Sequence, residues 1–249
     1  LISDFIKEFS VFLTTEQGLK NATVWLACMW VKTIVLRAHY NGLIPRNPFA
    51  QFRITPNVKE REYLTEGEIR QLIEHEFTDA TLAFTRDLFV FACFTALSFA
   101  DIRELTTDDI MDVNGEKWII SKRHKTGVPF QVKLLDIPLQ IIGKYRPFQK
   151  DNSVFGEINY WSICKKLKNV IRECNINKQI SFHVARHTFG TLALSKGMPI
   201  ESVSRVLGHT NIKTTQIYAK ITTQKLGNDL TAFGNQLNRT FGNIKVAGV

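Results

Sequence analysis

Several features are scarce in this chain of 249 residues. Its four cysteines are widely separated, and none is paired at the Cys-x-x-Cys spacing of metal-binding or redox sites. The longest apolar stretch, at 88–100, falls short of the roughly 20 residues that a membrane-spanning helix needs. We also find no secretory signal peptide. These absences predict a cytoplasmic protein with reduced thiols that does not enter a membrane.

Negative charge is scarce as well, because 23 Asp and Glu stand against 32 Lys and Arg and leave a net charge of +9. A basic protein suits a polyanionic partner, since each phosphate that it neutralises releases condensed counterions. An anionic membrane surface is the competing partner on charge alone. The choice between them therefore depends on the motifs.

The length and the 44% hydrophobic content are sufficient for two domains with buried cores. The first segment is helical in pattern, and a second helix is predicted from Asn21, which can cap it, to about Gly42. Three prolines between positions 45 and 56 then indicate an interdomain linker. We therefore predict a small helical domain, a linker and a larger, mostly helical domain.

The larger domain opens with a capping box at Thr65 to Glu68, where a hydroxyl and a carboxylate satisfy free helix amides. Helical patterns continue to Ala96. Residues 117–135 change to strand-like segments around the basic turn Lys122 to Gly127. Everything from Pro138 onward is helical again. The predicted fold class is mainly α with a small antiparallel β-sheet.

Polar residues then gather where a helical core does not need them. His183 and Arg186 are three residues apart, so both project from one face of the first turn of a helix, and His187 follows directly. The amides at that helix start add positive potential, which suits a bound phosphate. A pair of solvated surface residues would give the same pattern.

Three further polar residues accompany the His183 to His187 motif: Lys125 before it, and His209 and Tyr218 after it. Gly208 ends a short helix and turns His209 outward, and Tyr218 lies nine residues beyond His209 on another short helix. Lys125 stands at the tip of the basic turn. A lone tyrosine on a helix is usually a packed aromatic side chain with a wet hydroxyl. The order of the features carries more information than any one of them.

His-x-x-Arg-His at 183–187, Leu-Gly-His at 207–209, Tyr218 and the upstream Lys-Thr-Gly turn closely resemble the catalytic signature of the tyrosine recombinase (phage integrase) family. Integrases of mobile genetic elements are particularly similar. The resemblance extends over nearly the whole chain. It implies a SAM-like helical core-binding domain over 1–57 and a tyrosine recombinase catalytic domain over 58–249. It also implies a site-specific recombinase that cleaves and rejoins DNA.

The resemblance also implies a role for each residue in a metal-independent reaction. Tyr218 would attack the scissile phosphate and form a 3′-phosphotyrosyl link, while Arg186 grips the non-bridging oxygens. Lys125 would be the general acid for the 5′ oxygen. His183 would act as acid or base near Tyr218, and His209 would hydrogen-bond the phosphate. A zinc site is the competing interpretation, but the adjacent arginine opposes a cation and no Cys or carboxylate completes the ligand shell. We therefore expect no metal and no cofactor.

One position departs from the family pattern. The family usually has Thr-Gly-Leu-Arg followed three residues later by an acidic residue, whereas here Ser98 stands at the arginine position and Asp101 at the acidic one. Locally, the pair is a capping-box variant that opens a helix. Arg103 or Arg86 could replace the missing cation in space, although Arg103 lies roughly 140° around a helix from Ser98. Alternatively, the enzyme is slow or has lost catalysis.

Double-stranded DNA is the partner that the resemblance implies, with a monomer in solution and a tetramer on paired sites. An apolar stripe near the end of the chain either packs on its own domain or docks into a neighbouring protomer. Its members are Leu226, Leu230, Phe233, Leu237 and Phe241. Many family members begin with a further arm-type DNA-binding domain, which we expect this sequence to lack. A DNA-binding protein of the same fold with weak catalysis and a type IB topoisomerase-like enzyme are the competing functions.

Overall fold

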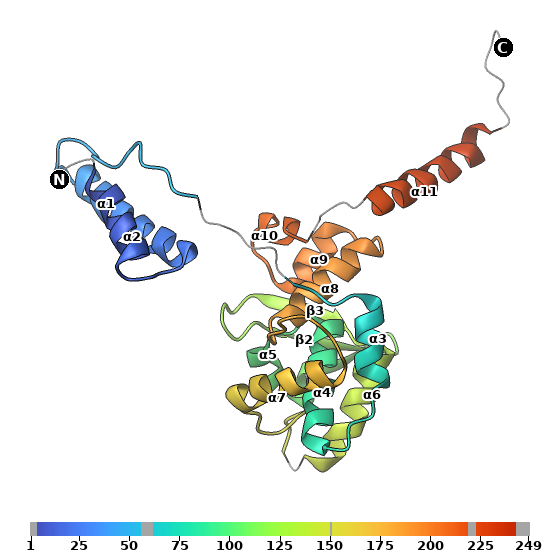
Figure 1. Ribbon diagram of the computed structural model, residues 1–249. Helices are drawn as coiled ribbons and strands as arrows, with labels where there is room; N and C mark the ends of the chain where they lie inside the picture. Colours follow the sequence, from blue (N-terminus) through green and yellow to red (C-terminus); the bar gives the residue numbers. More distant parts are fainter. Residues whose placement is uncertain (1–3, 56–61, 150, 219–222, 243–249) are drawn as a thin grey trace, which may run out of the picture. The chain divides into compact units, whose positions relative to one another are not determined.

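The computed structural model describes residues 4–55, 62–149, 151–218 and 223–242. The chain divides into two compact units, Leu1–Glu60 and Arg61–Val249 (Figure 1). Within the described ranges, no helix is both long and apolar enough to cross a membrane. Most of the segment predicted as a linker, 45–55, instead belongs to the first unit, where Phe49 is buried in the core and Phe52 and Ile54 pack against it. Pro56 lies outside the described residues.

The first unit is a pair of helices, α1 (Phe5–Thr15) and α2 (Asn21–Tyr40). Its core consists of six buried side chains: Ile6, Leu13, Val24, Cys28, Val35 and Phe49. Helix α2 ends as predicted, because Gly42 takes a left-handed φ of +71° just after it. The prediction that Asn21 caps α2 was wrong: Lys20 occupies the cap position and Asn21 is the first helical residue.

The second unit begins with α3 (Glu66–Glu74), α4 (Ala80–Thr95) and α5 (Phe99–Arg103). The capping box predicted before α3 is confirmed, since the Thr65 amide donates to the Glu68 carboxylate at 2.7 Å and the Thr65 hydroxyl accepts from the Glu68 amide. The apolar stretch noted in the sequence forms most of α4. This helix is buried almost all round because it packs against α3, α6, α7 and α8.

The sheet has three antiparallel strands in the order β1 (Ile110–Val113), β2 (Glu116–Lys122) and β3 (Pro129–Lys133). The sequence predicted β2 and β3 but not β1. Strand β1 is mostly exposed, so it lacks the alternation by which a half-buried strand is recognised. The signal that could have found it is Asn114-Gly115, whose positive φ values of 55° and 80° form the two-residue turn between β1 and β2.

The rest of the second unit is helical, which confirms the predicted mainly α fold class. The elements are the 3₁₀ turns η1 (Thr107–Asp109) and η2 (Arg146–Phe148), and the helices α6 (Asp136–Tyr145), α7 (Tyr160–Glu173), α8 (Val184–Ser195), α9 (Ile200–Leu207), α10 (Lys213–Gln216) and α11 (Thr223–Phe241). Helix α11 carries the predicted apolar stripe. Its members Leu226, Leu230, Phe233 and Leu237 are all exposed, and the side chain of Phe241 lies outside the described residues.

Candidate active site

Arg186 is the buried centre of the candidate site. It lies in α8 with 9% of its surface exposed, and its guanidinium donates to the carbonyls of Ala96 and Leu207, the latter at 2.6 Å. Ala96 ends α4 in a left-handed conformation, and Leu207 is the last residue of α9. Burial and the nearby charge of Arg123 lower the pKa of Arg186 to about 10, so it remains a cation at neutral pH.

Arg123 is a second buried cation that the sequence prediction missed. It follows β2 directly and pairs with Asp101 at 2.8 Å, while its guanidinium stacks 3.9 Å above the Phe130 ring centroid. It also donates to the carbonyl of Val206. Its Nε is buried with no hydrogen-bond partner among the described residues. Alternation along β2 could have revealed it, because buried Ile119 and Arg123 are four residues apart and therefore share one face.

Asp101 contacts both Arg123 and Ser98, the residue at which the sequence departs from the expected pattern. Its carboxylate accepts hydrogen bonds from the Ser98 hydroxyl at 2.8 Å and from the His124 amide at 3.0 Å, besides the ion pair with Arg123. Burial alone would raise the pKa of Asp101, but the charge of Arg123 and these hydrogen bonds lower it overall. The capping box predicted for Ser98 and Asp101 is confirmed at the start of α5.

His209 lies beside both arginines. Gly208 ends α9 with a left-handed φ of +65°, as predicted, and an added Cβ there would lie 2.8 Å from Arg123 Nε. The Nδ1 atom of His209 is 2.8 Å from the hydroxyl of the fully buried Thr215. Burial, followed by the charges of Arg186, Arg123 and His183, lowers the pKa of His209 to about 4. His209 is therefore neutral at pH 7.

Tyr218 lies two residues beyond the last residue of α10 rather than within the helix that the sequence predicted. It is 9% exposed, and its ring packs over Gly190 of α8, where a Cβ would come within 2.8 Å of a ring carbon. The centroid of the Tyr218 ring lies 5.2 Å from that of His187, and the His187 centroid lies 4.7 Å from that of His183. The buried His187 thus stands next to the tyrosine, with His183 exposed beyond it.

The remaining basic candidates differ in position. Lys125 is exposed on the turn between β2 and β3, two residues from Arg123. Within the described residues, no side-chain hydrogen bond or ion pair joins it to the other site residues. Arg103 is exposed and pairs with the adjacent Glu104 at 2.9 Å. The suggestion that Arg86 replaces the missing cation is wrong, since its guanidinium binds Asp87 and the carbonyls at the end of α3.

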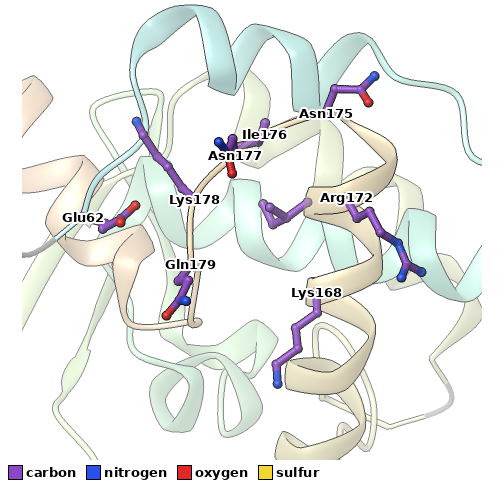
Figure 2. Close-up of a pocket in the computed structure, with 9 residues that line it drawn as sticks. Glu62, Lys168, Arg172, Asn175, Ile176, Asn177, Lys178 and Gln179 are labelled. Atoms are coloured by element: carbon purple, nitrogen blue, oxygen red, sulfur yellow. The ribbon is translucent and has the colours of Figure 1, made fainter.

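Two hollows open on the second unit. One, of about 310 Å³, is lined by Arg186 and His183 together with Ser98 and Arg103, so it brings four of the predicted residues to one place. The other, of about 540 Å³, lies where α7 ends and the following segment begins (Figure 2). Its lining is polar and basic but includes none of the residues predicted for chemistry.

The site concentrates positive charge around a buried tyrosine. Arg186 donates to the carbonyl of Leu207 and Arg123 to that of Val206, so both cations gather at the end of α9 that leads into His209, and this region favours an anion such as a phosphate. No group of three or more metal-binding side chains occurs in the described part of the chain. The two arginines suit a phosphate, and the ring of Tyr218 lies on the helix that carries Arg186.

Comparisons with known proteins agree on one family. A model of the phage integrase family matches residues 62–225. A tyrosine recombinase of Thermosipho africanus is 23% identical over 231 residues, which cover 90% of this chain and 80% of the relative. The tyrosine recombinase XerC of Oceanobacillus iheyensis is 25% identical over 237 residues, covering 88% and 77%.

Solved structures show the same fold. The Tn1549 transposon integrase in complex with circular intermediate DNA is similar with a TM-score of 0.76 at 18% identity, covering 92% of this chain and 85% of that one. A lambda integrase dimer bound to a COC′ core site is similar with a TM-score of 0.68 at 16% identity, covering 88% and 79%. Both likenesses extend well beyond the range that the family model matches.

Proposed function

The chain belongs to the phage integrase family of tyrosine recombinases, and we propose that Tyr218 is its nucleophile. The protein is a site-specific recombinase that cleaves and rejoins DNA strands. The assignment of the site depends mainly on one observation: the ring of Tyr218 packs on α8, the helix that also carries Arg186. A phosphotyrosine intermediate needs this combination of nucleophile and phosphate-binding cations.

Arg186 and Arg123 together bind the scissile phosphate in this proposal. Arg123 supplies the charge that family members have at the position of Ser98, from a different element of the fold. Two features support it: Arg123 influences the pKa of Arg186, and it keeps a buried Nε–H donor without a partner among the described residues. Asp101 orients Arg123 through their ion pair. The missing arginine is thus replaced rather than lost.

The histidines divide the remaining work. The Thr215 hydroxyl lies 2.8 Å from Nδ1 of the neutral His209. When this hydroxyl donates, the ring carries its proton on Nε2, from where it can donate to a phosphate oxygen. His183 serves as acid or base for the Tyr218 hydroxyl. His187 packs against the rings of both His183 and Tyr218 and so helps to position them.

The reaction forms one bond and breaks one bond in each half. The Tyr218 oxygen, having given up its proton, attacks phosphorus, and the bond from phosphorus to the 5′ oxygen breaks. Lys125 donates the proton that this 5′ oxygen needs, which requires the exposed turn to approach the DNA. Rejoining is the reverse: the 5′ hydroxyl of a second strand attacks the 3′-phosphotyrosyl link and releases Tyr218. The bond energy is retained in the link, so no nucleotide cofactor is consumed.

Double-stranded DNA is the proposed partner, bound by the core-binding domain at 1–57 and the catalytic domain at 58–249. We propose a monomer in solution and a tetramer on paired sites. The exposed stripe of α11 supports this assembly, because contiguous exposed apolar side chains typically mark an interface. The DNA substrate and four free cysteines both agree with a cytoplasmic location.

Covalent trapping tests the proposed nucleophile. A binding site is first selected from random duplexes by native-gel shift and then prepared as a nicked duplex, from which the cut end diffuses away. Wild-type protein should give a covalent protein–DNA band on a denaturing gel, and Tyr218→Phe should bind the same DNA without giving the band. Binding without a band in the wild type would instead support the non-catalytic alternative. A band that persists in Tyr218→Phe would identify a different nucleophile.

A further inference from the structure

The hollow of about 310 Å³ beside Arg186 and His183 contains more than the phosphate chemistry uses. Phe99, Tyr160 and Phe182 also line it, and Arg103 contributes a cation. The reaction proposed above gives no task to this aromatic wall or to Arg103. The hollow is within the usual size range of ligand pockets, although at its lower end.

The wall is a fixed aromatic surface. The Phe99 centroid lies 5.1 Å from that of Tyr160 and 5.2 Å from that of Phe182, with both ring pairs close to perpendicular. Phe99 and Phe182 are buried, whereas Tyr160 is half-exposed. Beside Tyr160, the Trp161 ring is 79% exposed. Large aromatic side chains left open in this way are typical of surfaces that bind a partner.

Arg103 is available to an incoming anion. Its side chain is 45% exposed, and its ion pair is with the adjacent Glu104 at 2.9 Å. Such an exposed pair contributes little because water and salt screen it. A phosphate at the edge of the pocket can therefore replace the carboxylate at small cost.

We propose that this pocket binds the nucleotide next to the scissile phosphate on the cleaved strand. The deoxyribose packs against Tyr160, and the adjacent phosphate is held by Arg103. The pocket offers the kinds of group that a DNA strand needs, two cations, Arg186 and Arg103, for two phosphates and an aromatic wall for the sugar between them. The proposal rests on the proposed function, because it takes the scissile phosphate to lie at Arg186.

The departure at position 98 is what leaves the pocket open. Ser98 lines it with a short side chain whose hydroxyl is held by Asp101 at 2.8 Å. A longer side chain at this position would occupy space beside Arg186. Since the contacts are to sugar and phosphate, the pocket positions the strand and reads no base sequence.

The test combines Arg103→Ala with DNA in which one phosphate at a time is a neutral methylphosphonate. On native DNA, we expect Arg103→Ala to slow covalent-complex formation by about 10-fold, the effect of one hydrogen-bonded contact to a charged group. On DNA neutralised at the phosphate adjacent to the cut, the wild type should slow by a similar factor and Arg103→Ala should slow no further.

Arg172→Ala is the matched control, because Arg172 is an exposed arginine of the same unit that lines the other hollow (Figure 2). Its rate should equal that of the wild type. Tyr160→Ala should also slow cleavage, and Tyr160→Phe should restore it, since the ring supplies the contact. An Arg103→Ala defect that is the same at every methylphosphonate position, or that Arg172→Ala reproduces, would overturn the proposal.

A wild type that gives no covalent band contradicts the proposed function and leaves this inference testable. The methylphosphonate series is then measured by equilibrium binding. A penalty of Arg103→Ala that disappears at one phosphate position supports the pocket. A penalty that is absent, or equal at all positions, refutes it.

Discussion

Replacement of Arg123 should affect stability and catalysis for separate reasons. Its ion pair with Asp101 is 2.8 Å long, and the two side chains are only 6% and 4% exposed. Removing one partner of a buried pair typically costs about 3–5 kcal/mol, because the other charge is left uncompensated. Ser98 and His124 still hydrogen-bond the carboxylate, so we expect Arg123→Ala to lower the free energy of unfolding by about 3 kcal/mol. Urea denaturation followed by circular dichroism measures this loss.

The same substitution should slow DNA cleavage. Loss of one preorganised contact to the reacting phosphate costs on the order of 3 kcal/mol, or about 100-fold in rate. The double variant Arg123→Ala/Asp101→Asn also removes the charge that Arg123→Ala leaves unpaired. It should recover part of the stability and none of the rate. Rates are measured in single turnovers at a temperature where circular dichroism finds every variant folded, with Asp101→Asn alone as the control.

Two results would refute this reasoning. If the double variant regained both stability and rate, Arg123 would serve only to hold the fold, and the phosphate would depend on Arg186 alone. If Arg123→Ala lost less than about 1 kcal/mol of stability, the pair would behave like an exposed one and its burial would be contradicted.

Three further predictions concern the neighbouring residues. Thr215→Val should slow cleavage about 10-fold in single turnovers, because His209 loses the hydroxyl that hydrogen-bonds its Nδ1 and orients its ring, and Thr215→Ser should not. The folded-state pKa of His209 is about 4, below the roughly 6.5 of an unfolded histidine, so the unfolded state takes up the proton first as pH falls. The wild type should therefore lose more free energy of unfolding than His209→Asn as pH falls from about 6.5 to 4, in urea titrations at each pH. Gly208→Ala should lower the melting temperature, because alanine is strained at φ +65° and its Cβ approaches Arg123; an unchanged melting temperature would contradict this geometry.

The parts of the molecule that could be predicted from the sequence are those determined by residues close together in the chain. The capping boxes at Thr65 and Ser98 and the helix end at Gly208 each depend on three or four consecutive positions. The ordered motifs from His183 to Tyr218 could also be recognised in a single sequence, because their order and spacing along the chain are informative. Local patterns therefore predicted the fold class, whereas the candidate site residues came from the resemblance of the ordered motifs to the family.

Arg123 could not be assigned from the sequence because its role depends on long-range contacts. Its partner Asp101 is 22 residues away in the chain, and the carbonyl of Val206 is 83 residues away. Alternation along β2 could have marked Arg123 as facing inward among the four basic residues of this turn, but it does not say which distant groups the side chain contacts. The prediction that Tyr218 lies within a helix was wrong for a similar reason. Helix α10 ends at Gln216, and the Tyr218 ring packs against Gly190, which is 28 residues away in the chain.

The two carbonyls that hold Arg186 have a consequence for how activity is lost on heating. Each stands at the carboxyl end of a helix, α4 or α9, where the helix dipole is negative and favours a cation. The guanidinium is therefore oriented by the framework of the fold before any DNA arrives. Both carbonyl-bearing residues are buried, Ala96 at 0% and Leu207 at 1% exposure, so neither helix end should fray before the domain unfolds. The temperature at which cleavage stops should therefore coincide with the cooperative melting of the catalytic domain rather than precede it.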